Sequence, residues 1–140
     1  MDMSWFETMA ADAEARHEVY ERLGFADLRL VVEEQDGATT KRYGLVLDGY
    51  DVLATGEVED IASFGAEAVL SGPRDAWDEM AANIAAHGGA DNAHTLNSLT
   101  IAETPLKVSS RDPLGRDKFF RYAETLQTLF DSLQRVGEAA

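Results

Sequence analysis

The sequence contains no cysteine, only three prolines, and fewer than half as many basic as acidic residues. The lack of cysteine excludes disulfides, thiolate catalysis and cysteine-ligated zinc or iron–sulfur sites. The 12 lysines and arginines stand against 26 acidic residues, which gives a net charge of −14. Such a surface repels phosphate backbones and anionic lipid head groups. We therefore expect neither nucleic acid as a partner nor stable insertion into a membrane.

Long hydrophobic runs are missing as well, so no segment is expected to cross a bilayer. The opening residues Met1-Asp2-Met3-Ser4 soon give way to acidic ones, which is not the pattern of a signal peptide. The sequence thus predicts a cytoplasmic protein. Its 140 residues, 45% of them hydrophobic, suit one domain over residues 1–140 with its own core.

The first third predicts one helix and then a β-meander. Ser4 and Glu7 have the spacing of a capping box, and Gly24 suits a helix stop. The apolar stripe of this helix comprises Trp5, Met9, Ala13, His17 and Tyr20. Three alternating runs follow, and Asp36-Gly37 and Asp48-Gly49 between them favour tight antiparallel hairpins.

The rest of the chain alternates between helix and strand signals. We expect a strand at Ala66 to Leu70, a helix that starts at Gly72-Pro73 and a stop at His87-Gly88-Gly89. Residues 98–109 predict a last strand or strand pair. A final amphipathic helix opens at Asp112-Pro113. Its apolar face covers residues 119–133, Phe120 lies off that face, and Gly137 closes the helix.

The candidates for catalysis are weak. His87 and His94 share a loop with Asp91, and His17 lies on the first apolar stripe. A metal site needs three or four convergent ligands, so no metal is predicted. Ser71-Gly72-Pro73 lacks the glycine that precedes the serine of a hydrolase elbow, and no phosphate-binding glycine loop occurs.

Carboxylates and basic residues leave two interpretations open. Glu57, Glu59 and Asp60 suit a solvated face, although acidic side chains can still pair in space. Basic residues cluster at the start of the last helix, where helix amides already favour an anion. The cluster comprises Arg111, Arg116, Lys118 and Arg121, with Lys107 upstream. It is either a site for an anionic head group or a set of surface ion pairs.

Several segments from Tyr43 onward follow a familiar order. They are the Asp48-Gly49 hairpin, the strand ending Val69-Leu70-Ser71-Gly72, the helix opening Pro73-Arg74-Asp75-Ala76-Trp77, and the late runs Leu99-x-Ile101 and Leu106-x-Val108 before an amphipathic helix. In this order the chain resembles the sterol carrier protein 2-like family, in its bacterial or archaeal type. The resemblance covers most of the chain.

The resemblance implies an α+β fold: a mixed, mostly antiparallel five-stranded sheet covered by helices, with an apolar tunnel between the layers. It also implies non-catalytic binding or carriage of a sterol, fatty acid or acyl-CoA-like molecule, without a metal or redox cofactor. The expected apolar wall consists of Trp77, Met80, Ile84, Phe119, Tyr122, Leu126 and Phe130. The basic cluster Arg111, Arg116, Lys118 and Arg121 would meet an anionic head group.

Departures from the family pattern keep other functions open. Ser98 and Ser110-Arg111-Asp112 stand near places where the family commonly has glycines. The end of the pocket can therefore be remodelled. One alternative is a small enzyme or accessory subunit acting on a hydrophobic substrate, with His17, His87 or His94 as base. Another is an interaction module in which the Trp5-Phe6-Met9 surface of the first helix binds a partner or a second copy.

Overall fold

A mixed five-stranded sheet organises the fold, in the strand order β3-β2-β1-β4-β5. The computed structural model describes residues 1–135, apart from the side chain of Ala54. The strands are β1 (Ala26–Asp36), β2 (Thr39–Gly49), β3 (Asp51–Glu57), β4 (Ala68–Pro73) and β5 (Lys107–Ser109). β1 pairs antiparallel with β2 and parallel with β4, whereas β2–β3 and β4–β5 are antiparallel. The predicted meander and mixed sheet are confirmed.

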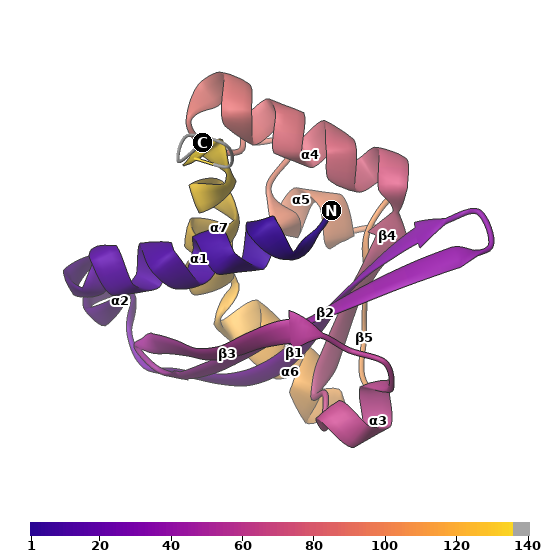
Figure 1. The fold of residues 1–140 in the computed structure, drawn as a ribbon, viewed down its shortest axis with the longest axis horizontal. Coiled ribbons are helices and arrows are strands. Elements are labelled where there is room, and N and C mark those ends of the chain that lie inside the picture. Colours follow the sequence, from indigo (N-terminus) through magenta and orange to yellow (C-terminus); the bar gives the residue numbers. More distant parts are fainter. Residues whose placement is uncertain (136–140) are drawn as a thin grey trace.

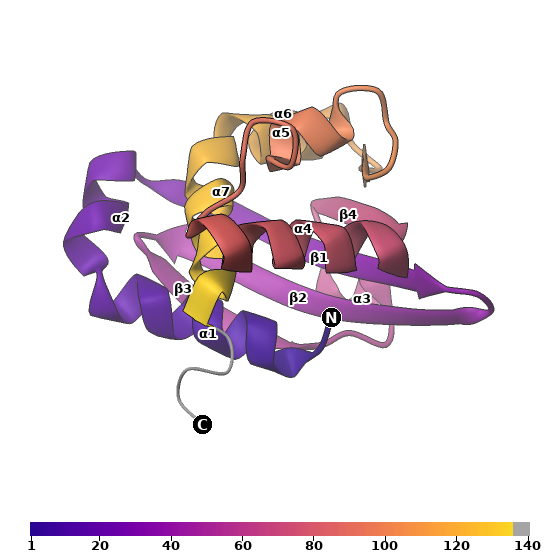
Figure 2. The same ribbon diagram turned by 90° about the horizontal axis from the view of Figure 1, so that it is seen from above.

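Helices gather mainly on one side of this sheet, and the short α3 lies apart from them (Figures 1 and 2). They are α1 (Met3–Ala15), α2 (His17–Leu23), α3 (Ile61–Phe64), α4 (Arg74–His87), α5 (Leu96–Thr100), α6 (Pro113–Arg121) and α7 (Ala123–Asp131), followed by the 3-10 turn η1 (Ser132–Arg135). The α+β class with helices covering a sheet is therefore confirmed.

The core lies between the sheet and these helices. Alternate residues of β1 and β2 point into it, because successive side chains of a strand face opposite sides. Leu28, Leu30 and Leu45 are completely buried there, and so are the rings of Phe119 and Phe130. Burial of each such side chain stabilises the fold by roughly 1.5–3 kcal/mol.

The first helix differs from its prediction in two ways. Its N-cap is Asp2, whose carboxylate accepts a hydrogen bond from the Ser4 amide at 2.9 Å, so Ser4 is not the cap. Aspartate is as strong a cap as serine. The helix also breaks at Arg16, and α2 runs on to a cap at Gly24. The break turns the His17 side chain outward, where it is 45% exposed.

The C-terminal third departs further from expectation. Residues 98–109 do not form a strand pair, because Leu96–Thr100 is helical and only Lys107–Ser109 pairs with β4. The Thr95 side chain caps the short helix by accepting from the Ser98 amide. Asp112 caps the last helical segment as expected, but that segment is divided at Tyr122 into α6 and α7. Its predicted end at Gly137 lies outside the described residues.

Candidate ligand-binding site

A small hollow reaches from the surface toward the core, between the α1–α2 pair, the adjoining ends of β1–β3 and α7. It is lined by Ala13, Tyr20, Gly24, Ala26, Leu47, Gly49, Tyr50, Asp51, Val52, Thr125 and Leu129. Its volume of about 10 Å³ is room for about one water molecule. We call this set of residues the hollow.

Small residues create the hollow. Ala13 of α1 and Ala26 of β1 are both buried, and each leaves space that a larger side chain would fill. Gly24 ends α2 and Gly49 ends β2, both with positive φ angles of 106° and 74°. Leu129 of α7, fully buried, forms part of the apolar lining. From its opening inward, the hollow is therefore lined first by turn residues and then by core residues.

Tyr50, which lines the hollow, contacts two further aromatic rings. Tyr50 is 40% exposed and Phe25 is 62% exposed, and their ring centroids lie 6.3 Å apart in an edge-to-face arrangement. The His17 ring meets Tyr50 in the same manner at 6.2 Å. We call His17, Phe25, Tyr50 and Asp51 the mouth. The exposed parts of the Phe25 and Tyr50 rings are not used in core packing.

The mouth is acidic. His17 Nε2 lies 2.9 Å from Glu21 Oε1, and His17 Nδ1 lies 3.7 Å from Asp51 Oδ1. The side chains of Glu21 and Asp51 are 53% and 70% exposed. Asp48 is opposite both Asp27 and Asp51 in the strand register, but it follows the hollow-lining Leu47, so its side chain faces the other side of the sheet.

The predicted apolar wall lies deeper than the hollow. Its members Trp77, Met80, Ile84, Phe119, Leu126 and Phe130 are fully buried, and Tyr122 is half-buried. None of the seven lines the hollow. Trp77 and Phe130 instead stack with their ring centroids 6.0 Å apart. These side chains fill the core, and their contact with a ligand stays a prediction.

The residues of the basic cluster make different contacts. Lys118 donates to Glu67 at 2.6 Å and to Asp27 at 3.3 Å. Arg116 donates to the Val108 carbonyl oxygen at 2.8 Å and lies over the Phe120 ring. Arg111 borders a separate open groove near β4 and β5, and Arg121 is exposed. For Lys118, the structure therefore shows surface ion pairs, which was one of the two interpretations of the basic cluster.

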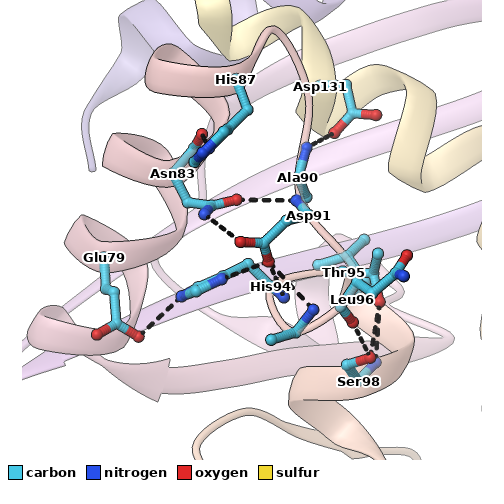
Figure 3. Close-up of polar contacts among 12 residues, drawn as sticks. Glu79, Asn83, His87, Ala90, Asp91, His94, Thr95, Leu96, Ser98 and Asp131 are labelled. Carbon is cyan, nitrogen blue, oxygen red and sulfur yellow. Dashed lines mark hydrogen bonds and ion pairs between the residues drawn. The ribbon is translucent and has the colours of Figure 1, made fainter.

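The other two histidines, His87 at the end of α4 and His94 in the loop between α4 and α5, lie in one polar network (Figure 3). Asp91 accepts from His94 Nδ1 at 2.7 Å and from Asn83 Nδ2 at 2.8 Å, while His94 Nε2 lies 3.3 Å from Glu79. His87 Nδ1 contacts the Asn83 carbonyl oxygen at 2.9 Å. This network ties the loop to α4, and neither histidine lines the hollow.

Two further sequence expectations can be compared with the structure. Within residues 1–135, no three histidine, aspartate or glutamate side chains converge as metal ligands. The expected docking surface of the first helix is wrong, because Trp5, Phe6 and Met9 are buried in the core and Phe6 stacks on Tyr43 at 4.9 Å.

The mouth was not singled out by the sequence, although a signal for it exists. Gly24-Phe25 and Gly49-Tyr50 both place an aromatic residue directly after a turn glycine. Apolar periodicity detects the stripes of helices and strands, and it passes over aromatic residues in turns. The register of β1 with β2, in which Ala26 is opposite Gly49, brings these two turns together.

Comparison with known structures assigns the fold. A structure of sterol carrier protein 2 superposes with a TM-score of 0.69 at 13% identity, covering 95% of both chains. A conserved hypothetical protein from Thermus thermophilus gives 0.66 at 11% identity, over 94% of this chain and 87% of the other. The apo form of sterol carrier protein 2 from Yarrowia lipolytica gives 0.53 at 15% identity, over 92% and 88%.

The chain thus has the fold of sterol carrier protein 2 structures, as the resemblance implied. No protein-family model matches the sequence, and no curated protein matches it significantly. Among residues 1–135, none of the helices combines the length and hydropathy that a bilayer crossing demands.

Proposed function

We propose that this protein binds and carries an apolar small molecule, without catalysing a reaction on it. The observation that carries the proposal is a hollow that runs from exposed rings to the core in a chain with the sterol carrier protein 2 fold. Fold alone does not assign function. The resemblance adds sterols, fatty acids and acyl-CoA-like molecules as candidate ligands.

The hollow must widen to hold such a ligand, because its closed volume suits about one water molecule. Widening would displace side chains that separate the hollow, at Leu129, from the predicted apolar wall, at Trp77 and Phe130. Each methylene group moved from water into this apolar space contributes about 0.8 kcal/mol. A chain of about ten carbons therefore offsets a substantial cost of opening.

Of the elements around the hollow, α2 is the segment that we infer to move, with Tyr20 as its anchor to Asp12 of α1. Its N-cap, Arg16, makes no side-chain capping hydrogen bond, and the helix has only seven residues. Isolated helices this short are marginal in water. α2 also ends at Gly24 beside the mouth, so a shift of α2 enlarges the hollow while the sheet stays in place.

A pair of neighbouring substitutions on β3 tests the site. Val52 lines the hollow, whereas Leu53 is the next residue on the strand, 66% exposed and facing the opposite side. We expect Val52→Phe to plug the hollow and weaken binding of Nile red, a neutral dye that fluoresces in apolar surroundings. Leu53→Phe is the matched control and should bind the dye like the natural chain.

The measurement is Nile red fluorescence, followed by competition with decanol and cholesterol, with circular dichroism to verify that both variants fold. Saturable binding that Val52→Phe alone weakens supports the site. A dye that never binds saturably, or binds both variants equally, contradicts a carrier function through the hollow.

A further inference from the structure

The mouth presents three rings to an incoming head group. Tyr50 stands between His17 and Phe25 and meets each ring edge to face. Tyr50 is 40% exposed, and it lines the hollow together with Asp51. Exposed tyrosine and phenylalanine faces attract cations, and quaternary ammonium groups above all, through the ring quadrupole.

The charges around these rings also favour a cation. Asp51 and Glu21 are both more than half exposed. The strongly negative net charge of the chain adds to their field. A carboxylate or phosphate that approached the mouth would be repelled, whereas an ammonium group would be attracted.

Nearby basic residues do not reverse this field. Arg16 donates to Asp12 at 2.9 and 2.6 Å, and Lys118 is held by Asp27 and Glu67. The Arg22 side chain lies about 100° around the axis of α2 from that of Glu21, so the two do not share one face of the helix. His17 already lies against two carboxylates.

We propose that the mouth selects cationic amphiphiles, an alkyl chain that carries a quaternary ammonium head group, over anionic ones such as fatty carboxylates. The inference rests on the proposed function, since it assigns the head-group class of the ligand whose chain enters the hollow. It moves the head group away from the basic cluster of α6 and places it on Tyr50, Phe25, Asp51 and Glu21.

Three ligands with one alkyl chain test the selection: decyltrimethylammonium, decanol and decanoate, each below its micelle concentration at pH 7.5, in competition with Nile red. We expect the ammonium to bind at least about tenfold more tightly than decanoate, with decanol between them. The double variant Glu21→Gln/Asp51→Asn should reduce that ratio to about twofold. Tyr50→Leu should weaken the ammonium more than decanol, since it removes the aromatic face that attracts the cation.

The matched control is Glu7→Gln/Glu14→Gln, which removes the same charge from exposed positions on α1. This control should keep the tenfold preference. If decanoate binds as tightly as the ammonium or more tightly, the inference is overturned while the carrier function stands. The same holds if both double variants lose the preference for the ammonium to the same extent. If none of the three ligands displaces the dye, the proposed function fails and the head-group selection fails with it.

Discussion

Trp77 and Phe130 stack across the core with their ring centroids 6.0 Å apart and their planes 19° from parallel. The same tryptophan donates from Nε1 to the carbonyl oxygen of Glu33 on β1 at 3.1 Å. Trp77 therefore joins α4 to the sheet by a polar contact and to α7 by an apolar contact. Both rings are completely buried.

Replacement of Trp77 should reveal both contacts. Trp77→Phe keeps an aromatic ring and leaves the buried Glu33 carbonyl oxygen without its donor, so we expect a loss of about 1–3 kcal/mol in the free energy of unfolding. Trp77→Ala also leaves a cavity and should cost about 3–5 kcal/mol. Urea denaturation followed by far-ultraviolet circular dichroism measures both. Equal stability of Trp77→Phe and the natural chain would show that the hydrogen bond contributes nothing.

Asp12 joins both ends of the described chain. Its buried carboxylate accepts from Arg16 at 2.9 and 2.6 Å, from the Tyr20 hydroxyl at 2.7 Å, and from Arg135 of η1. Burial by itself raises the pKa of Asp12, but the hydrogen bonds from Arg16 and Tyr20 outweigh it and lower the pKa below its ordinary value. The charged form is thus the stable one in the fold.

Asp12→Asn should destabilise the protein by about 2 kcal/mol, because a charged acceptor of three residues is lost. Tyr20→Phe removes one donor and should cost about 1 kcal/mol. The double variant should cost less than the sum of the two single variants, since both remove the same hydrogen bond. Urea denaturation of the four proteins measures this coupling. Strict additivity would indicate that the Asp12–Tyr20 contact carries no energy.

Local signals predicted the elements whose ends are set by nearby residues. The Asp36-Gly37 and Asp48-Gly49 turns give the meander, and Asp112 caps α6 as expected. Residues 98–109 were misread because Leu99 and Leu106, both buried, fit a strand as well as a helix followed by a loop. The Leu106 amide donates to the Leu99 carbonyl oxygen at 3.1 Å, a contact that alternation does not reveal.

The candidate site could be predicted only in outline. The buried wall residues follow from helical periodicity, as the burial of Met80, Ile84 and Leu126 shows. The hollow depends on α1, three strand ends and α7 meeting in space, and no local pattern encodes that meeting. The break at Tyr122 is marked by neither glycine nor proline, so the change of direction that starts α7 was also invisible in the sequence.

Gly115 allows the closest approach between α6 and the sheet. A Cβ at this position would overlap the carbonyl oxygen of Glu67, a backbone atom that cannot turn aside. Gly115→Ala should therefore lower the free energy of unfolding by about 3 kcal/mol. Gly56→Ala is the control, since nothing lies within 4 Å of a Cβ there. Thermal unfolding should separate the two variants, and similar melting temperatures would contradict the close approach.

The Asp91–His94 pair predicts a pH dependence of stability. The hydrogen bond from His94, assisted by Asn83, lowers the pKa of Asp91 to about 2. The same hydrogen bond to Asp91, assisted by Glu79, raises the pKa of His94 above its ordinary value. Protonated His94 thus stabilises the fold fully below its unfolded pKa of about 6.5, and this contribution is lost as the pH rises through the higher folded pKa. The Asp91 contribution is complete above about pH 4 and is lost as the pH falls toward 2.

His94→Asn isolates the first of these effects. The melting temperature of the natural chain relative to this variant should be highest near pH 6 and should decline by pH 9, as His94 loses its proton. His87→Asn is the matched control, because His87 contacts only the Asn83 carbonyl oxygen in the same network and should leave the decline in place. A parallel pH profile for the natural chain and His94→Asn would mean that the loop between α4 and α5 is held by its other contacts, the bonds from Ala90 to Asp131 and from Leu96 to Gln127.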